Sequence, residues 1–257
     1  MVMFSLIKTC QIEPLTFEVA GLKLVGGIAK PKKYRDKHKG ILYIPGAPRT
    51  ASEKLTSKYA DETIPKLCKL GFSVFVFKFP GTGDSEGRLE LNSLSLRLKV
   101  AAAAYDKLIM QDQLMKDHIG VNATSIAGHI ACRLTELRPV KGLVLDAPAA
   151  YGKEAEDKLW NGEFTEAIRK PDSWSNSPAF TALEKFTGHT LLVYSEHDEV
   201  IPLPIQNEYK RIVTTKKDEV VLLQEAGHQI HLDNSKGNKN ARKVLADKSE
   251  SFFVRYL

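Results

Sequence analysis

The chain has 257 residues, of which 43% are hydrophobic, and this is enough for one large domain with a sizeable core. Lysine and arginine outnumber aspartate and glutamate by 37 to 31, which gives a formal net charge of +6, and part of this excess lies in the basic run from Lys30 to Lys39. The longest apolar runs are strand-sized and far too short to span a bilayer, so we expect no membrane span.

Apolar and turn residues predict a hairpin first and then a regular alternation of strands and helices. Met1 to Ile7 is apolar, but no basic residue precedes it and no small-residue cleavage site follows it, so we expect a strand there rather than a secretory signal. Leu15–Val19 and Leu22–Ala29 predict an antiparallel hairpin. The elements that follow are, in chain order, strand Gly40–Ile44, helix Ser52–Leu70, strand Ser73–Phe77, helix Leu91–Met110, strand Ile119–Asn122, helix Ile126–Leu137, strand Gly142–Leu145, strand His189–Tyr194, helix Pro204–Val213, strand Glu219–Leu223 and helix Ala241–Leu257.

Apolar strands that alternate with longer helices predict an α/β fold with a mostly parallel central sheet and helices on both faces. We expect a single domain over residues 1–257, with residues 149–187 as a small helical cap inserted between two strands. This insertion has no strand signal and carries Trp160 and Trp174. Because ligands of open α/β sheets bind at the carboxyl ends of the strands, these two side chains are candidates for substrate binding. They could equally fix the insertion to the core.

The basic run and the cysteines carry weaker signals. Lys30 to Lys39 could form an anion-binding or nucleic-acid-binding patch, but it lies between two predicted strands and holds one aromatic residue. We therefore interpret it as a solvated turn and expect no nucleic-acid partner. The three cysteines, Cys10, Cys68 and Cys132, have a spacing that suits neither a zinc site nor a disulfide framework. A reducing, cytoplasmic location fits them best.

Two serines compete for the role of nucleophile. Ser85 lies in a literal G-x-S-x-G pattern, Gly83 to Gly87, but further residues from Arg88 onward intervene before the next predicted helix. Ser125 follows a predicted strand and directly precedes a predicted helix, although alanines stand where glycines are usual. A sharp strand-to-helix turn exposes the hydroxyl and places the helix N-terminus beside a developing oxyanion. The sequence therefore favours Ser125, with Ser85 in a tight surface turn.

A general base is expected in a loop after a late strand, where the chain returns to the same edge of the sheet. His228 fits this position because it follows the predicted strand Glu219–Leu223 and a glycine. His231 is close behind it and could be the base, a supporting residue or a polar loop residue. We interpret His129 and His197 as bystanders. A zinc site at the two neighbouring histidines is a minor possibility, because no glutamate or cysteine set completes it.

The acid is expected after the preceding strand, His189–Tyr194. Asp198 is the best candidate, with Glu196 and Glu199 as competing carboxylates. Its role would be to accept a hydrogen bond from the second ring nitrogen of His228 and so fix the tautomer.

An oxyanion needs two backbone N–H donors. One is expected from Ile126, the residue after the nucleophile. The other is expected from the loop after the first parallel strand, where Pro45 and Pro48 lack an N–H and Ala47 is the natural donor.

The order nucleophile, acid, base resembles that of the α/β-hydrolase superfamily, and the resemblance covers nearly the whole chain. Three further segments carry it: Pro45-Gly46-Ala47, the loop Phe79 to Gly87, which is similar to R-G-x-G-x-S-x-G, and Asp198-x-x-Ile201-Pro202, which is similar to D-x-x-V-P. The compact cap resembles the monoacylglycerol lipase and serine aminopeptidase group or the small bacterial esterases. The alanine-flanked elbow resembles that of the acyl-transferase and thioesterase of bacterial bioluminescence.

The resemblance implies the α/β-hydrolase fold and a serine hydrolase that cleaves a carboxylic ester or thioester through an acyl-enzyme on Ser125. Acyl transfer or peptide cleavage on the same residues is an alternative within catalysis, and a non-hydrolytic binding protein is an alternative outside it. No metal or organic cofactor is expected, and the partner would be a small-molecule acyl ester or thioester.

Overall fold

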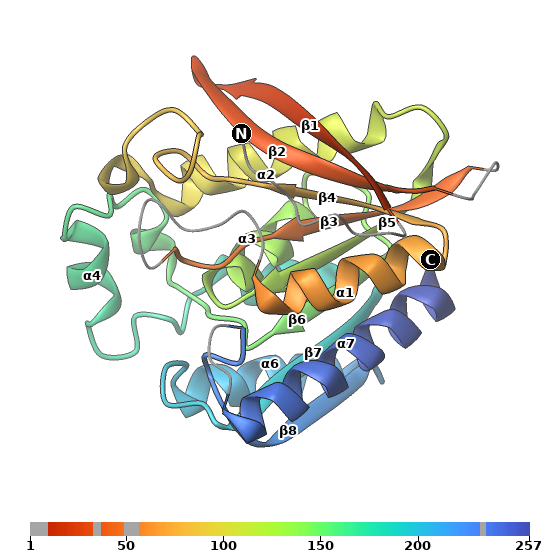
Figure 1. Ribbon diagram of the computed structural model, residues 1–257. Coiled ribbons are helices and arrows are strands. Elements are labelled where there is room, and N and C mark those ends of the chain that lie inside the picture. Colours follow the sequence, from red (N-terminus) through yellow and green to blue (C-terminus); the bar gives the residue numbers. More distant parts are fainter. Residues whose placement is uncertain (1–9, 33–36, 49–56, 232–234) are drawn as a thin grey trace.

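The computed structural model describes residues 10–32, 37–48, 57–231 and 235–257 (Figure 1). The predicted strand at Met1 to Ile7, the middle of the basic run and the first residues of the predicted helix from Ser52 lie outside these ranges.

An eight-stranded sheet forms the centre of the molecule, with strand order β1-β2-β4-β3-β5-β6-β7-β8 (Figure 1). Strands β3 to β8 run parallel, whereas β2 pairs antiparallel with both β1 and β4. The strands are β1 (Cys10–Val19), β2 (Leu22–Pro31), β3 (His38–Ile44), β4 (Phe72–Phe77), β5 (Leu114–Thr124), β6 (Gly142–Asp146), β7 (His189–His197) and β8 (Glu219–Gly227). The chain reverses its direction of travel across the sheet between β3 and β5, and ligands bind at such switch points.

Helices cover both faces of the sheet, and each face has its own hydrophobic core. Helices α1 and α7 pack on one face, while α2, α3, α5 and α6 pack on the other (Figure 1). The helices are α1 (Lys58–Lys69), η1 (Leu89–Leu91), α2 (Leu94–Ile109), α3 (Ile126–Leu134), η2 (Lys153–Ala155), α4 (Glu163–Ile168), α5 (Pro178–Lys185), α6 (Leu203–Thr215) and α7 (Lys236–Tyr256). The predicted mostly parallel sheet with helices on both faces is confirmed.

Several boundaries differ from the sequence-based prediction. The predicted helix Leu91–Met110 begins later, at Leu94, because the side chain of Ser93 accepts a hydrogen bond from the N–H of Leu96 and caps the helix. Strand β8 continues four residues beyond the predicted end at Leu223. As a result, His228 follows the last residue of the strand directly.

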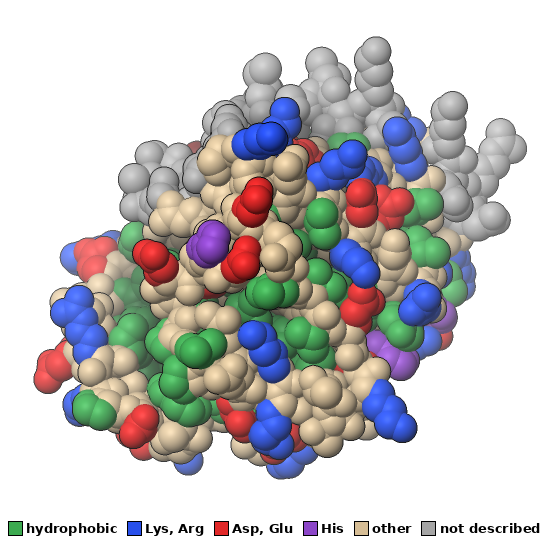
Figure 2. Space-filling model, turned by 90° about the horizontal axis from the view of Figure 1, so that it is seen from below, with side chains coloured by type: hydrophobic (Ala, Val, Ile, Leu, Met, Phe, Trp, Pro, Cys, Tyr) green, Lys and Arg blue, Asp and Glu red, His purple; other side chains and the backbone are tan. Residues whose placement is uncertain are grey.

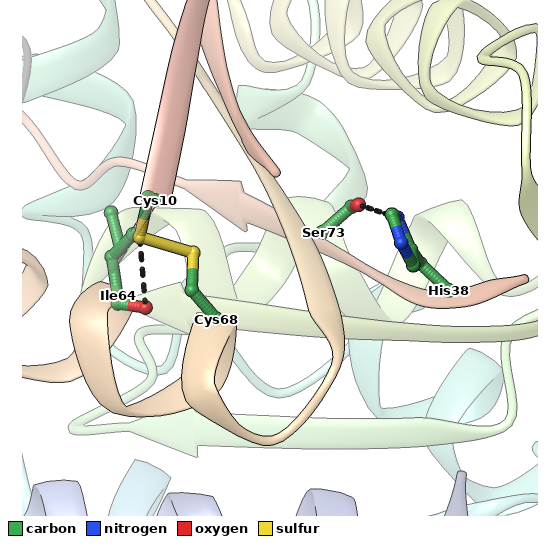
Figure 3. Close-up of a disulfide and its surroundings, with 5 residues drawn as sticks. All are labelled: Cys10, His38, Ile64, Cys68 and Ser73. Atoms are coloured by element: carbon green, nitrogen blue, oxygen red, sulfur yellow. Dashed lines mark hydrogen bonds between the residues drawn. A yellow bond between two sulfur atoms is a disulfide. The ribbon is translucent and has the colours of Figure 1, made fainter. Parts of the chain in front are cut away.

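The interpretation of the cysteines is wrong in one respect. Cys10 at the start of β1 and Cys68 near the end of α1 form a disulfide (Figure 3). Cys132 is a buried free thiol. The bond joins residues 58 apart in the sequence, and no short cysteine motif has this spacing. Only the fold brings the edge of the sheet and this helix together, so the cysteine pattern no longer supports a reducing compartment.

The described surface mixes charges of both signs. On the face shown in Figure 2, acidic and basic side chains are interspersed with hydrophobic ones rather than gathered by sign. Within the described ranges, no helix has the length and apolar character needed to cross a membrane.

Candidate active site

Ser125 occupies the sharp turn between β5 and α3. Its backbone is in a strained conformation, with φ 57° and ψ −125°, which a residue with a side chain rarely adopts. The N–H of Ser125 donates to the carbonyl of Asp146 over 2.9 Å, and its carbonyl accepts from Gly128 and Ala149 over 2.8 and 3.0 Å. Two hydrogen bonds to the end of β6 and the segment after it, and one within the turn itself, therefore hold the strained conformation in place.

The residues around this turn are small because space is limited. Ala123 and Ala127, which stand at the usual glycine positions, are fully buried, so the fold accommodates both methyl groups. The tightest position is one residue further on. A Cβ atom on Gly128 would lie 2.4 Å from Cβ of Pro148, so this residue must be glycine for α3 to approach the segment after β6.

His228 and Asp198 complete a hydrogen-bonded chain with Ser125. Nε2 of His228 lies 3.2 Å from Oγ of Ser125, and Nδ1 of His228 lies 2.9 Å from Oδ2 of Asp198. The three residues come from the carboxyl ends of β5, β7 and β8, which meet at one edge of the sheet. The structure thus brings together the three residues that the sequence nominated as nucleophile, acid and base.

The Asp198 carboxylate is buried and well supplied with donors. Its Oδ1 accepts from the N–H groups of Val200 and Ile201 over 2.9 and 3.0 Å, while Oδ2 faces His228. Burial alone would raise the pKa of Asp198, but the bonds from His228 and the two backbone amides hold this pKa below its usual value. Asp198 is therefore a carboxylate at neutral pH and fixes which ring nitrogen of His228 carries a proton.

The competing acids and one of the other histidines point elsewhere. Glu196 accepts a hydrogen bond from the N–H of Glu225 across the β7–β8 pair, and the Glu199 side chain is exposed. The His197 side chain is 65% exposed and lies 3.8 Å from Glu196. None of these side chains is hydrogen-bonded to His228 in the described structure.

His231 has a partner that the sequence reasoning missed. Its Nε2 is hydrogen-bonded to Oδ2 of Asp146, and both side chains are buried beneath the turn. The same Asp146 accepts from the N–H of Ser125, so one residue fixes both the turn and the loop that carries His228. The available signal was its position: Asp146 is a polar residue at the end of β6, beside the strand that carries Ser125.

His228 and His231 do not share a site, because their rings face different carboxylates. Nowhere in the parts of the chain that the structure describes do three His, Cys, Asp or Glu side chains gather in a way that could hold a metal ion.

The two expected oxyanion donors lie beside Ser125. Ile126 is the first residue of α3, and Ala47 follows Gly46 in the loop after β3. A Cβ atom on Gly46 would lie 3.7 Å from Cβ of Ser125, so this loop packs against the turn. Among the described residues, neither amide donates to a backbone carbonyl outside the regular helices and strands.

Comparisons with known proteins identify the fold. No family model matches the sequence, and none of the curated proteins matches it. Solved structures do match. Acylaminoacyl peptidase from Pyrococcus horikoshii has a TM-score of 0.74 at 15% identity, covering 97% of this chain and 42% of that one. Dienelactone hydrolase from Anabaena variabilis has a TM-score of 0.66 at 18% identity, covering 97% of this chain and 99% of that one.

A predicted hydrolase from Thermoplasma acidophilum, described as CIB-like, gives a TM-score of 0.62 at 17% identity over 94% of this chain and 99% of that one. These structures share one architecture with the molecule described above. The chain has the α/β-hydrolase fold. This confirms the fold class that the sequence predicted.

Within this α/β-hydrolase fold, the second serine has a structural position. Ser85 is buried, and its Oγ accepts from the N–H of Val25 over 3.0 Å and donates to the carbonyl of Lys78 over 3.1 Å. Both partners belong to the antiparallel β2–β4 region. The hydroxyl of Ser85 ties the glycine-rich loop to the sheet, which fits the expected tight turn.

The two tryptophans of the segment between β6 and β7, for which the sequence predicted a cap, have different surroundings. Trp160 is half-buried, stacks on Arg97 of α2 and packs near Phe164 of α4. Trp174 is also half-buried, and its ring meets the edge of Phe180, which in turn packs on the core through α6. Trp174 therefore helps to attach the cap to the core, while Trp160 covers a charged side chain.

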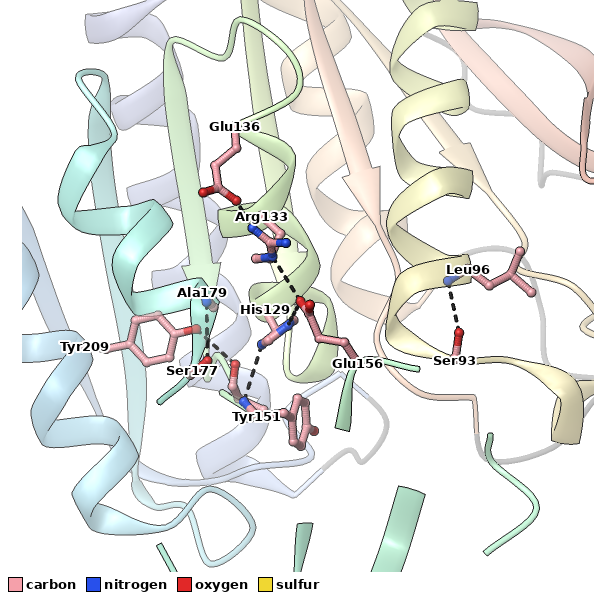
Figure 4. A network of polar contacts seen from close by, with 11 residues as sticks. Ser93, Leu96, His129, Arg133, Glu136, Tyr151, Glu156, Ser177, Ala179 and Tyr209 are labelled. Atoms are coloured by element: carbon pink, nitrogen blue, oxygen red, sulfur yellow. Dashed lines mark hydrogen bonds and ion pairs between the residues drawn. The ribbon is translucent and has the colours of Figure 1, made fainter. Parts of the chain in front are cut away.

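His129 joins the cap to α3 in a polar network (Figure 4). It is buried, its Nδ1 accepts from the N–H of Tyr151 over 3.4 Å, and its Nε2 lies 3.4 Å from Glu156. Glu156 also accepts from Nε of Arg133 over 3.0 Å. Burial lowers the pKa of His129 despite the opposing effect of Glu156, so a neutral ring connects the two segments.

Proposed function

We propose that the protein is a serine hydrolase that cleaves a carboxylic ester or thioester through an acyl-enzyme on Ser125. One observation carries this proposal: Ser125, in a strained turn at a helix N-terminus, is hydrogen-bonded to His228, which is hydrogen-bonded to Asp198. This order of contacts is what nucleophilic catalysis by a hydroxyl requires.

In the first half of the reaction, Oγ of Ser125 attacks the substrate carbonyl while Nε2 of His228 takes its proton. Asp198 accepts the hydrogen bond from Nδ1–H and stabilises the imidazolium that forms. The carbonyl oxygen becomes negatively charged and accepts hydrogen bonds from the amides of Ala47 and Ile126. His228 then gives its proton to the leaving alcohol or thiol, and the acyl group remains on Ser125.

In the second half, His228 activates water, which attacks the acyl-enzyme and releases the carboxylic acid. Ser125 takes back the proton, and the site is ready for another substrate. An acceptor alcohol or amine in place of water would make the protein an acyltransferase. The cap residues Trp160 and Trp174 would lie on the side from which the substrate approaches, and Trp160 is the stronger candidate for contact with it because it covers a polar side chain.

The fold is compatible with several substrate classes. One similar structure is a peptidase and another a dienelactone hydrolase, and identities of 15% and 18% do not distinguish between them for this chain. We favour ester or thioester cleavage because the alanine-flanked elbow resembles that of an acyl-transferase and thioesterase, whereas the compact cap resembles esterases and serine aminopeptidases alike.

Labelling with a fluorophosphonate tests the proposal directly, because this probe reacts only with an activated serine. We expect labelling of the parent protein, no labelling of Ser125→Ala and retained labelling of Ser85→Ala. Hydrolysis of p-nitrophenyl butyrate should follow the same pattern. Labelling that survives in Ser125→Ala, or its absence from the parent, would contradict the proposal, and the second result would favour a non-hydrolytic binding protein.

A further inference from the structure

A buried arginine without a partner lies beneath the cap. Arg97, in the first turn of α2, is 0% exposed, and none of its guanidinium nitrogens has a hydrogen-bond partner among the residues that the structure describes. A guanidinium carries five N–H donors and accepts nothing. Buried charges are costly unless they are paired, so an arginine in this state points to a missing acceptor.

Two aromatic rings enclose this guanidinium. Its Cζ lies 4.1 Å from the centre of the Phe79 ring and 3.8 Å from the centre of the Trp160 ring. Such stacking favours the cation but satisfies none of its N–H groups. The indole N–H of Trp160 is also buried without a partner. Two donor-only groups thus lie against each other, and an anionic oxygen ligand is the chemistry that would satisfy both.

No carboxylate of the described protein neutralises Arg97. Burial lowers the pKa of Arg97 to about 9, and the one opposing influence comes from the Tyr151 hydroxyl rather than from an acid. Glu156, in the neighbouring cap segment, is already engaged by Arg133 and His129 (Figure 4). The arginine therefore stays charged at neutral pH without a counter-ion.

The segment that carries Tyr151 is hydrogen-bonded to α3 and to the turn at Ser125. The N–H of Tyr151 donates to Nδ1 of His129, which lies one helical turn after Ser125 (Figure 4). The N–H of Ala149 donates to the carbonyl of Ser125. Phe79 follows the carboxyl end of β4, at the same edge of the sheet as the candidate site. Helix α2, which carries Arg97 in its first turn, begins after the carboxyl end of β4, on the same edge of the sheet as Ser125.

We propose that Arg97 and Trp160 form a carboxylate-binding subsite, so that the preferred substrate is an ester or thioester bearing a second, free carboxylate. This inference rests on the proposed function for the ester and thioester part only. The guanidinium would bind the carboxylate through two parallel N–H···O bonds, and the indole N–H would add a third. The subsite selects for charge at one end of the substrate while Ser125 reacts at the other.

Paired substrates test the selectivity. Mono-p-nitrophenyl adipate and p-nitrophenyl hexanoate have acyl chains of the same length. The far end of the chain is a carboxylate in the first and a methyl group in the second. A second pair, the butyrates of p-hydroxybenzoate and p-cresol, places the charge on the leaving group. We expect the parent to favour the charged member of at least one pair, and Arg97→Met to lower that ratio of kcat/KM by about tenfold to a hundredfold. The matched control is Arg169→Met, which removes an exposed arginine of the cap and should keep the parent ratio.

A binding measurement tests the inference without hydrolysis, first on protein that keeps Arg97. The chain has two tryptophans, so a Trp174→Phe variant leaves Trp160 as the sole indole reporter. With Ser125→Ala added to prevent turnover, monomethyl adipate should change Trp160 fluorescence in a saturable way, and methyl hexanoate should not. Arg97→Met should abolish this change.

The two proposals fail in different ways. If the parent neither hydrolyses the esters nor reacts with a fluorophosphonate, the proposed function fails, while a saturable response to monomethyl adipate would still support the subsite. If the parent hydrolyses both members of each pair equally and Trp160 responds to neither adipate nor hexanoate ester, the subsite is refuted and Arg97 only packs between the two rings.

Discussion

Replacing Asp198 by asparagine should reverse the tautomer of His228. Oδ1 of Asp198 accepts two backbone N–H groups over 2.9 and 3.0 Å, and only Oδ2 faces the ring. The carbonyl oxygen of an asparagine would keep the two backbone bonds, because its NH₂ group cannot accept them. The NH₂ group would then face Nδ1 of His228, which must accept. The ring proton would move to Nε2, where it blocks removal of the proton from Ser125.

The size of the effect follows from the bonds involved. To act as a base in Asp198→Asn, His228 must carry its proton on Nδ1, where it faces the NH₂ group of the asparagine. Both groups are donors, so two buried donors are left unsatisfied, at a cost of about 1–3 kcal/mol each. The imidazolium also loses a charge-assisted hydrogen bond, about 1.5–3 kcal/mol. The total of about 5 kcal/mol corresponds to a loss of roughly a thousandfold to ten-thousandfold in kcat.

The assay is hydrolysis of p-nitrophenyl butyrate, with circular dichroism to verify the fold. Glu199→Gln is the matched control, because Glu199 is exposed and directly follows Asp198 in the sequence. This variant also removes one negative charge. It should remain within about twofold of the parent, as expected for an exposed charge that touches neither His228 nor Ser125. The reasoning is refuted if folded Asp198→Asn keeps kcat within about tenfold of the parent, or if the control loses as much.

Three further outcomes concern stability. Gly128→Ala should lower the free energy of unfolding by about 1–3 kcal/mol, measured with urea, because the new Cβ would lie 2.4 Å from that of Pro148. Replacing Cys10 and Cys68 together by serine should lower it by about 2–4 kcal/mol and make the melting temperature insensitive to dithiothreitol, because a bond across 58 residues constrains the unfolded chain. The hydrogen bonds to Asp198 lower its pKa in the folded state below the ordinary 3.8, so its contribution to stability is present above that pH and is lost as the pH falls through the folded value. Urea titrations at decreasing pH should therefore show an acid loss that is smaller in Asp198→Asn.

Each stability prediction has a result that would contradict it. Gly227→Ala is the control for the glycine, because a Cβ there would lie 3.6 Å from the nearest atom, an ordinary contact. Equal losses in the two variants would rule out the clash with Pro148. A parent protein whose melting temperature ignores dithiothreitol would argue against the disulfide. If the loss of unfolding free energy at low pH is the same in Asp198→Asn, it comes from other carboxylates.

Much of the fold was readable from the sequence because it depends on local periodicity. The alternation of apolar strands and longer helices determines a parallel sheet, and the strand ends then determine which loops meet. Ser125, Asp198 and His228 could be nominated for this reason, since each follows a predicted strand and the carboxyl ends of parallel strands lie at one edge. Boundaries were less accurate, as at Leu94, where a serine cap rather than periodicity decides where the helix begins.

What the sequence did not reveal depends on contacts between distant segments. The pairing of Asp146 with His231 joins residues 85 apart, and the disulfide joins residues 58 apart. Arg97 was also missed, because a basic residue on an amphipathic helix is normally solvated. Its burial becomes visible only when the cap folds back and places Trp160 over it.

The comparison of the two serines shows why a motif and its structural setting can disagree. The glycines around Ser85 allow the loop to turn tightly. The Ser85 hydroxyl is hydrogen-bonded to the N–H of Val25 and the carbonyl of Lys78, so it faces neither a general base nor an approaching substrate. The alanines around Ser125 fit because the tightest position of the elbow is Gly128, where α3 meets Pro148. A search for G-x-S-x-G therefore finds the glycines around Ser85 and misses Gly128 after Ser125. The requirement for a small residue is physical, and it applies to whichever position the neighbouring backbone approaches most closely.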